Sequence, residues 1–117
     1  MTFLKSMGEH TEIPHFLNKE DFDYYLNEFT RGGMRGPINW YRNIDRNWEM
    51  TKDTHEKKIS PLSCFIVGED DPVAKWTLIN PSLLENLVSS HTIKSAGHWV
   101  QQEKPEEVNK LLLDFFK

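Results

Sequence analysis

Residues 61–72, PLSCFIVGEDDP, are the most informative about the fold class. A short, mainly apolar run follows the proline, and a glycine and three acidic residues follow that run. Short apolar runs bounded by proline and glycine are typical of buried strands, so we expect a strand over residues 62–67. The acidic residues then form a turn at the carboxyl end of this strand.

The chain after this strand alternates between element types. We expect a helix after Pro81, a short strand over residues 91–95, and then a loop that contains His98. A closing helix begins at Pro105, and two glutamates in its first turn suit the positive end of a helix. Such alternation predicts parallel strands with crossover helices. Since parallel strands end at one edge of a sheet, the acidic turn and the histidine loop should be neighbours.

Helical patterns dominate the first half of the chain. Asn18 can cap a helix with one apolar face, and Gly32 and Gly33 end it. Pro37 suits the start of a second helix, which carries the aromatic sequence NWYRNIDRNW. The polar residues 51–60 indicate a surface connection between the two halves.

Composition excludes several classes of protein. The 117 residues suffice for one domain, and the net charge of −4 argues against a nucleic-acid partner. One cysteine excludes an intramolecular disulfide and a thiolate zinc site. No apolar run is long enough for a membrane or a signal peptide. We therefore expect a soluble, cytoplasmic α/β protein with no cofactor and no metal. His10 and His15 stand near Glu9 and Glu12, but at no recognised ligand spacing.

Asp71 and His98 could form a carboxylate–imidazole couple. The carboxylate would accept a hydrogen bond from one ring nitrogen and fix the tautomer, and the other nitrogen would act as a base on water. A simpler interpretation makes Asp71 a turn residue before Pro72 and His98 an exposed loop residue. Asp70 and Glu69 compete with Asp71 for the same role, and the sequence pattern does not separate them.

Tyr41 is a further candidate for chemistry. Its phenol is protonated at neutral pH and can donate a hydrogen bond to an oxygen that gains negative charge. It also fits as an aromatic residue at a contact between helices. Cys64 lies inside the predicted strand, where a thiol behaves as a small apolar group.

Three blocks of the sequence resemble a known family. They are GMRGPINWYRNIDRNWE (33–49), FIVGEDDPV (65–73) and SAGHWVQQEKPEEVNKLLLDFF (95–116). Their order and spacing resemble the C-terminal half of soluble epoxide hydrolases, which belong to the α/β-hydrolase family. The lead-in PHFLNKEDFDYYLNEFTR is similar to the cap segment of that family. The NWYRN block is specific to epoxide hydrolases within the larger fold, and the resemblance covers nearly the whole chain.

The resemblance implies a fold and a reaction. Residues 1–55 would be partial cap helices, and residues 56–117 the C-terminal part of an α/β-hydrolase core. That part holds the last two or so parallel strands with crossover helices, in an incomplete sheet. The family opens epoxides to vicinal diols through an alkyl-enzyme ester, which a water activated by the His–Asp pair hydrolyses.

The resemblance also implies a role for individual residues. Tyr41 matches the cap tyrosine that hydrogen-bonds the epoxide oxygen. Asp71 matches the acid that orients the histidine, and His98 matches the histidine that activates water. Trp40 and Trp99 would form walls of the substrate pocket.

Other parts of the family pattern are absent from these residues. They contain no nucleophile elbow, which is a G-x-x-x-G turn after a strand, and no HGxP segment. Tyr24 and Tyr25 do not match the second cap tyrosine. We therefore expect the chain to be inactive alone. We also expect it to associate through its open sheet edge, with itself or with a missing N-terminal half. Three alternatives stay open: a subunit that complements a separate catalytic half, a truncated reading frame, and another hydrolase of this fold such as a haloalkane dehalogenase.

Overall fold

The computed structural model describes residues 12–54, 56–76 and 81–117. The chain divides into two compact units, Met1–Met50 and Thr51–Lys117. The first unit contains the helices α2 (Lys19–Gly32), α3 (Arg35–Arg42) and α4 (Ile44–Thr51). The second contains η1 (Lys52–Thr54), β1 (Ile59–Gly68), α5 (Pro72–Trp76), η2 (Pro81–Leu83), β2 (Leu84–Ile93), α6 (Val100–Glu103) and α7 (Pro105–Phe115).

The ends of helix α2 are those predicted from the sequence. The side-chain oxygen of Asn18 accepts a hydrogen bond from the backbone amide of Asp21 at 2.8 Å, which satisfies a free donor of the first turn. Gly33 follows the helix with a φ of 68°, a left-handed value that costs glycine little. Its amide donates to the carbonyl oxygen of Phe29, so both ends of α2 have partners.

The second predicted helix is divided in two. Helix α3 begins two residues before Pro37, and the helical turns stop at Asn43 before α4 starts. The side-chain amide of Asn43 donates to the carbonyl oxygen of Asn39 at 2.9 Å. Such local side-chain hydrogen bonds compete with regular helix and explain why asparagine interrupts it.

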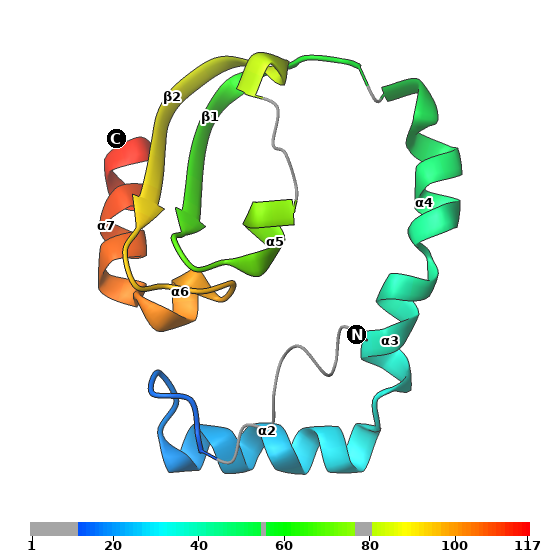
Figure 1. The fold of residues 1–117 in the computed structure, drawn as a ribbon, viewed down its shortest axis with the longest axis vertical. Coiled ribbons are helices and arrows are strands. Elements are labelled where there is room, and N and C mark those ends of the chain that lie inside the picture. The colour runs from blue at the N-terminus through cyan, green and yellow to red at the C-terminus, as the bar shows by residue number, and fades with distance from the viewer. Residues whose placement is uncertain (1–11, 55, 77–80) are drawn as a thin grey trace. The chain divides into compact units, whose positions relative to one another are not determined.

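The second unit is built on two parallel strands, and Figure 1 shows β1 and β2 side by side and pointing the same way. In the register, Phe65 pairs with Ser90 and Gly68 pairs with Ile93. The strands therefore end together, as predicted. The prediction of a helix after Pro81 is wrong, because β2 begins at Leu84. The apolar residues after Pro81 are spaced as in a helix but are also compatible with a strand, and pairing with β1 makes this segment a strand.

A small apolar core lies between β2 and the last helix. Ile93, Ala96 and Val108 are buried, and three further residues pack against them: Ile66, Val100 and Leu111. Pro105 is the first residue of α7, and this places Val108 against the end of β2. The sequence pattern Val108, Leu111, Leu112, Phe115 and Phe116 predicts one apolar face for this helix, but Phe116 is 77% exposed. Within the described ranges, no helix is both long and apolar enough to cross a membrane.

Candidate active site

Two turns meet where the parallel strands end. The backbone amide of Asp70, after β1, donates to the carbonyl oxygen of Ala96, after β2, at 2.9 Å. Gly68 makes this close approach possible. A β-carbon at this position would overlap the carbonyl oxygens of Ala96 and Gly97. The last residue of β1 therefore has to be glycine for the acidic turn and the histidine loop to touch.

Asp71 is the only buried charged residue within residues 12–54, 56–76 and 81–117, with 8% of its surface exposed. It directly precedes α5, and its Oδ1 accepts a hydrogen bond from the amide of Val73 at 2.7 Å. Pro72 suits the first position of that helix. Asp71 is therefore a helix cap as well as a candidate for chemistry, and the cap fixes the direction of its carboxylate.

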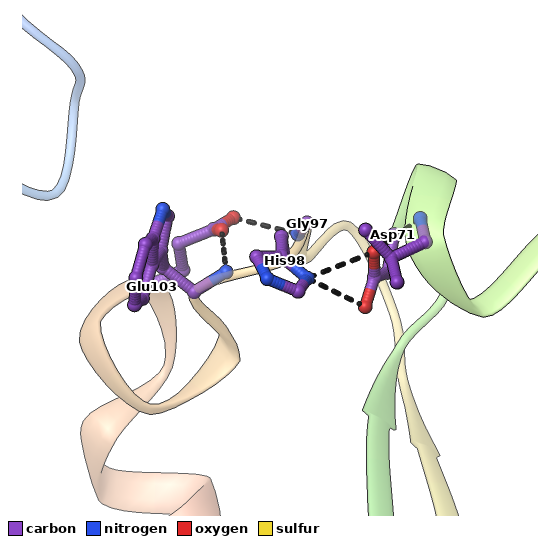
Figure 2. A network of polar contacts seen from close by, with 6 residues as sticks. Asp71, Gly97, His98 and Glu103 are labelled. Carbon is purple, nitrogen blue, oxygen red and sulfur yellow. Dashed lines mark hydrogen bonds and ion pairs between the residues drawn. The ribbon is translucent and has the colours of Figure 1, made fainter. Parts of the chain in front are cut away.

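The carboxylate of Asp71 contacts the ring of His98. Both Oδ1 and Oδ2 lie 3.1 Å from Nδ1, as Figure 2 shows. The Asp71 side chain is 11% exposed and that of His98 is 48% exposed. The buried partner is thus the carboxylate, and the imidazole reaches from it toward solvent. With Nδ1 on the carboxylate, Nε2 lies across the ring on the side away from Asp71.

The pKa of Asp71 is lowered from its ordinary value of 3.8. Burial raises this pKa, but several hydrogen bonds to the ionised form outweigh that effect. They come from the His98 ring and from the backbone amides of Val73 and Ala74, and the charge of the imidazole adds to them. The carboxylate therefore stays ionised at neutral pH, which is what a group that stabilises an imidazolium requires.

The competing acids make other contacts. Glu69 accepts a hydrogen bond from the backbone amide of Ser95 at 3.3 Å, which ties the two turns together at a second point. Asp70 contributes its backbone amide to Ala96. Neither side chain contacts His98 among the described interactions, so the structure selects Asp71 from the three acids that the sequence pattern left open.

The other predicted site residues are divided between the two units. Trp99 neighbours His98, with their ring centroids 5.4 Å apart in an edge-to-face arrangement. Tyr41 and Trp40 lie on α3 in the first unit, and they are 70% and 80% exposed. The structure therefore brings together Asp71, His98 and Trp99. The predicted roles of Tyr41 and Trp40 stay predictions.

Sequence reasoning missed Glu103. Its carboxylate accepts hydrogen bonds from the backbone amides of Gly97 at 2.7 Å and Trp99 at 3.2 Å, the two residues that flank His98 (Figure 2). The available signal was a glutamate four residues after Trp99, the cap of the short helix α6. Glutamates near a helix start often reach back to free amides, as in a capping box.

The surface of the second unit has a hollow away from Asp71 and His98. It runs along the junction of α6 and α7, and neither Asp71 nor His98 lines it. The described ranges contain no group of three or more histidine, cysteine or acidic side chains that could hold a metal ion. Glu9 and His10, two of the residues considered for a metal, lie outside the described residues.

Known proteins are similar to this chain in sequence and in fold. Epoxide hydrolase A of Mycobacterium tuberculosis is 43% identical over 115 residues, which cover 97% of this chain and 36% of that protein. The crystal structure of epoxide hydrolase A from Mycobacterium thermoresistibile superimposes with a TM-score of 0.82 at 40% identity. The superimposed region covers 92% of this chain and 34% of the M. thermoresistibile chain. The chain corresponds to a portion of the epoxide hydrolases of the α/β-hydrolase family.

This epoxide hydrolase portion spans about a third of the length of the relatives named above. A rat relative, bifunctional epoxide hydrolase 2, is 32% identical and is covered over 20% of its length. No family model matches the chain. The one G-x-x-x-G spacing in the sequence runs from Gly32 to Gly36. It joins the end of α2 to the start of α3 and has Met34 at its centre, so it is not a nucleophile elbow.

Proposed function

We propose that the chain supplies the water-activating couple and a cap tyrosine to an enzyme that opens epoxides to vicinal diols. The observation that carries this proposal is the contact of the buried Asp71 carboxylate with Nδ1 of His98, at 3.1 Å from both oxygens. An ionised acid behind an imidazole holds one tautomer and stabilises the imidazolium that forms when the ring takes a proton. The substrate would be a small-molecule epoxide, as in the named relatives.

The proposed reaction has two steps. In the first, an aspartate from outside these 117 residues attacks an epoxide carbon, a carbon–oxygen bond of the ring breaks, and Tyr41 donates a proton to the departing oxygen. In the second, Nε2 of His98 takes a proton from water as that water attacks the carbonyl carbon of the ester. Collapse of the resulting intermediate releases the diol and the aspartate, as the imidazolium of His98 gives its proton to the departing oxygen. The second proton of the water leaves the carboxyl group and returns to the Tyr41 phenolate, so that the carboxylate, His98 and Tyr41 regain their starting states. Asp71 stays ionised throughout.

This proposal includes inactivity of the chain alone. Without a nucleophile elbow the 117 residues cannot form the ester, and the Asp–His couple has nothing to hydrolyse. A nucleophile from a second segment, on the same polypeptide or on another, would complete the site. Within the described residues, β1 and β2 form a two-stranded sheet in which each strand has a strand partner on one side only, and further strands of the sheet would pair at the other sides.

A chimaera tests the proposal. The segment of M. tuberculosis epoxide hydrolase A that matches this chain would be replaced by residues 1–117, and the product assayed with a reporter epoxide. We expect turnover by the chimaera, none by the isolated chain, and loss of turnover in the chimaera with His98→Ala. A folded chimaera that leaves the epoxide intact would contradict the proposal, and so would full activity of the His98→Ala form.

A further inference from the structure

We propose that Glu103 is a positioning residue, whose carboxylate clamps the backbone on both sides of His98 and so holds the imidazole on Asp71. The inference rests on the proposed function in one respect: it treats His98 as the base. It adds a third member to the couple, one that acts through the backbone and touches neither the ring nor the reacting atoms.

The clamp consists of two hydrogen bonds to one carboxylate. Oε2 of Glu103 accepts from the amide of Gly97 at 2.7 Å, and Oε1 accepts from the amide of Trp99 at 3.2 Å. These amides belong to the peptide units before Gly97 and after His98. Fixing both units restrains the backbone dihedrals of the two residues between them, and hydrogen bonds to a charged acceptor are stronger than neutral ones.

Gly97 fits this role because it leaves room for the carboxylate. A β-carbon at this position would lie 3.0 Å from Oε1 of Glu103, closer than ordinary contacts allow. A side chain on residue 97 would therefore force the carboxylate to shift by a few tenths of an ångström from its present position. The short distance from Gly97 to Glu103 and the absence of a side chain at 97 belong to one arrangement.

His98 needs such a support because little else fixes its ring. Its side chain is 48% exposed, so packing restrains its rotamer less than it would in a buried residue. The ring contacts Asp71 on one side and also the exposed Trp99 ring. Figure 2 shows Glu103 and Asp71 on opposite sides of His98. The backbone is thus held from one side and the ring from the other.

Helix capping alone does not account for the geometry. Trp99 is the cap of α6 and makes no side-chain cap of its own, so Glu103 could serve that helix by accepting from the Trp99 amide. The bond from Gly97 is the shorter of the two, and Gly97 lies outside the helix. A test therefore has to report on the imidazole of His98, which a helix cap would leave unchanged.

Nitrogen-15 NMR of the full 117-residue chain provides that readout. The ring shifts give the ratio of Nδ1–H to Nε2–H imidazole in the neutral His98. We expect mostly Nδ1–H in the wild type, and a fall in the ratio of roughly fivefold in Glu103→Ala, as loss of an ordinary hydrogen bond would give. Glu103→Gln keeps one acceptor oxygen and should give an intermediate ratio. Glu107→Gln, an exposed glutamate in the first turn of α7, is the matched control and should match the wild type.

A second measurement uses only the wild-type chain, so it does not depend on the folding of any variant. In the wild type, the amide proton shifts of Gly97 and Trp99 should both follow the titration of the Glu103 carboxyl group. The proposal would be overturned if the amide proton shift of either residue did not change with protonation of the Glu103 carboxyl group. It would also be overturned if folded Glu103→Ala showed the wild-type ratio of Nδ1–H to Nε2–H imidazole at His98. If the wild-type chain contained no Nδ1–H imidazole, the His98 ring would not donate to Asp71 and the Asp–His couple would not exist. That result would contradict the proposed function as well, so the two failures are distinguishable.

Discussion

Both carboxylate oxygens of Asp71 lie 3.1 Å from Nδ1 of His98, across 27 positions of sequence. The contact depends on the parallel register that pairs Gly68 with Ile93, because each residue follows the end of its own strand. It also depends on the amide of Asp70 reaching the carbonyl oxygen of Ala96 between the two turns. The pair is therefore a product of the topology, and changes to the strand ends should reach it.

Gly68→Ala should break this arrangement. The added methyl group would overlap the carbonyl oxygens of Ala96 and Gly97 and force the two turns apart. We expect a loss of about 2 kcal/mol in the free energy of unfolding, as for other overpacked sites, measured by urea denaturation. Gly36→Ala is the matched control, because a β-carbon there meets nothing within 4 Å. Equal stability of the Gly68→Ala and Gly36→Ala forms would contradict the role given to Gly68.

Asp71 should make the free energy of unfolding depend on pH. Its lowered pKa means that the folded state favours the carboxylate, so its contribution is complete at pH values above the ordinary pKa of 3.8. The contribution is lost as the pH falls below 3.8 and through the lowered pKa of the folded chain. Denaturant unfolding of the wild type and Asp71→Asn at pH 7 and at pH 3 should therefore differ more at pH 7.

Asp114→Asn is the control for that comparison. The pKa of Asp114 is also lowered, first by its hydrogen bond from Lys110 and also by that from Lys117, but it lies on the exposed surface of α7. Salt screens exposed pairs, so its effect should be small and fade at high ionic strength. If the Asp71→Asn difference shows the same salt sensitivity, then burial of Asp71 is not the cause.

Val108→Ala should destabilise the second unit. Val108 is 5% exposed and forms the small core with Ile93 and Ala96, so removing two methyl groups leaves a cavity there. We expect a cost of about 2 kcal/mol, again from urea denaturation. Phe116→Ala removes a larger side chain that is 77% exposed, and it should change stability little. The reverse order of these two effects would contradict the packing of α7 on β2.

Tyr41→Phe should act on the chemistry and leave stability unchanged. The side chain is 70% exposed on α3, so its hydroxyl contributes little to folding. In the chimaera with epoxide hydrolase A, we expect about a 10²-fold fall in the rate of epoxide opening, typical of losing one donor to a developing oxyanion. Stopped-flow measurement of the first turnover checks this. An unchanged rate would return Tyr41 to the simpler role of an aromatic residue on a helix surface.

Sequence reasoning was sufficient where local chemistry decides the outcome. Asn18 and Gly33 bound α2 as predicted, and Pro105 starts α7, because caps and helix starts depend on neighbouring residues. It was also sufficient for the meeting of the acidic turn and the histidine loop, since parallel strands end at one edge whatever lies between them.

Sequence reasoning failed where the local structure depends on contacts with residues that are distant in the sequence. Leu84 and Leu87 suit a helix and a strand equally, and only pairing with β1 settles the choice. The sequence pattern did not separate Asp71 from its two neighbouring acids, and only the family resemblance singled it out. The reason is that the choice depends on which side chain the first turn of α5 holds toward His98. Glu103 escaped notice since its partners are backbone amides, which the sequence does not reveal.

Mass spectrometry of the His98→Ala chimaera, after it is mixed with an epoxide, tests the role of His98 most directly. If His98 activates the water that hydrolyses the ester, the first step should proceed without it and the second should stop. We expect a stoichiometric covalent adduct of one epoxide on the protein, with no diol released, whereas the unsubstituted chimaera should form diol and accumulate little adduct. Diol formation by the His98→Ala chimaera at the unsubstituted rate, or no adduct on a folded protein, would contradict it.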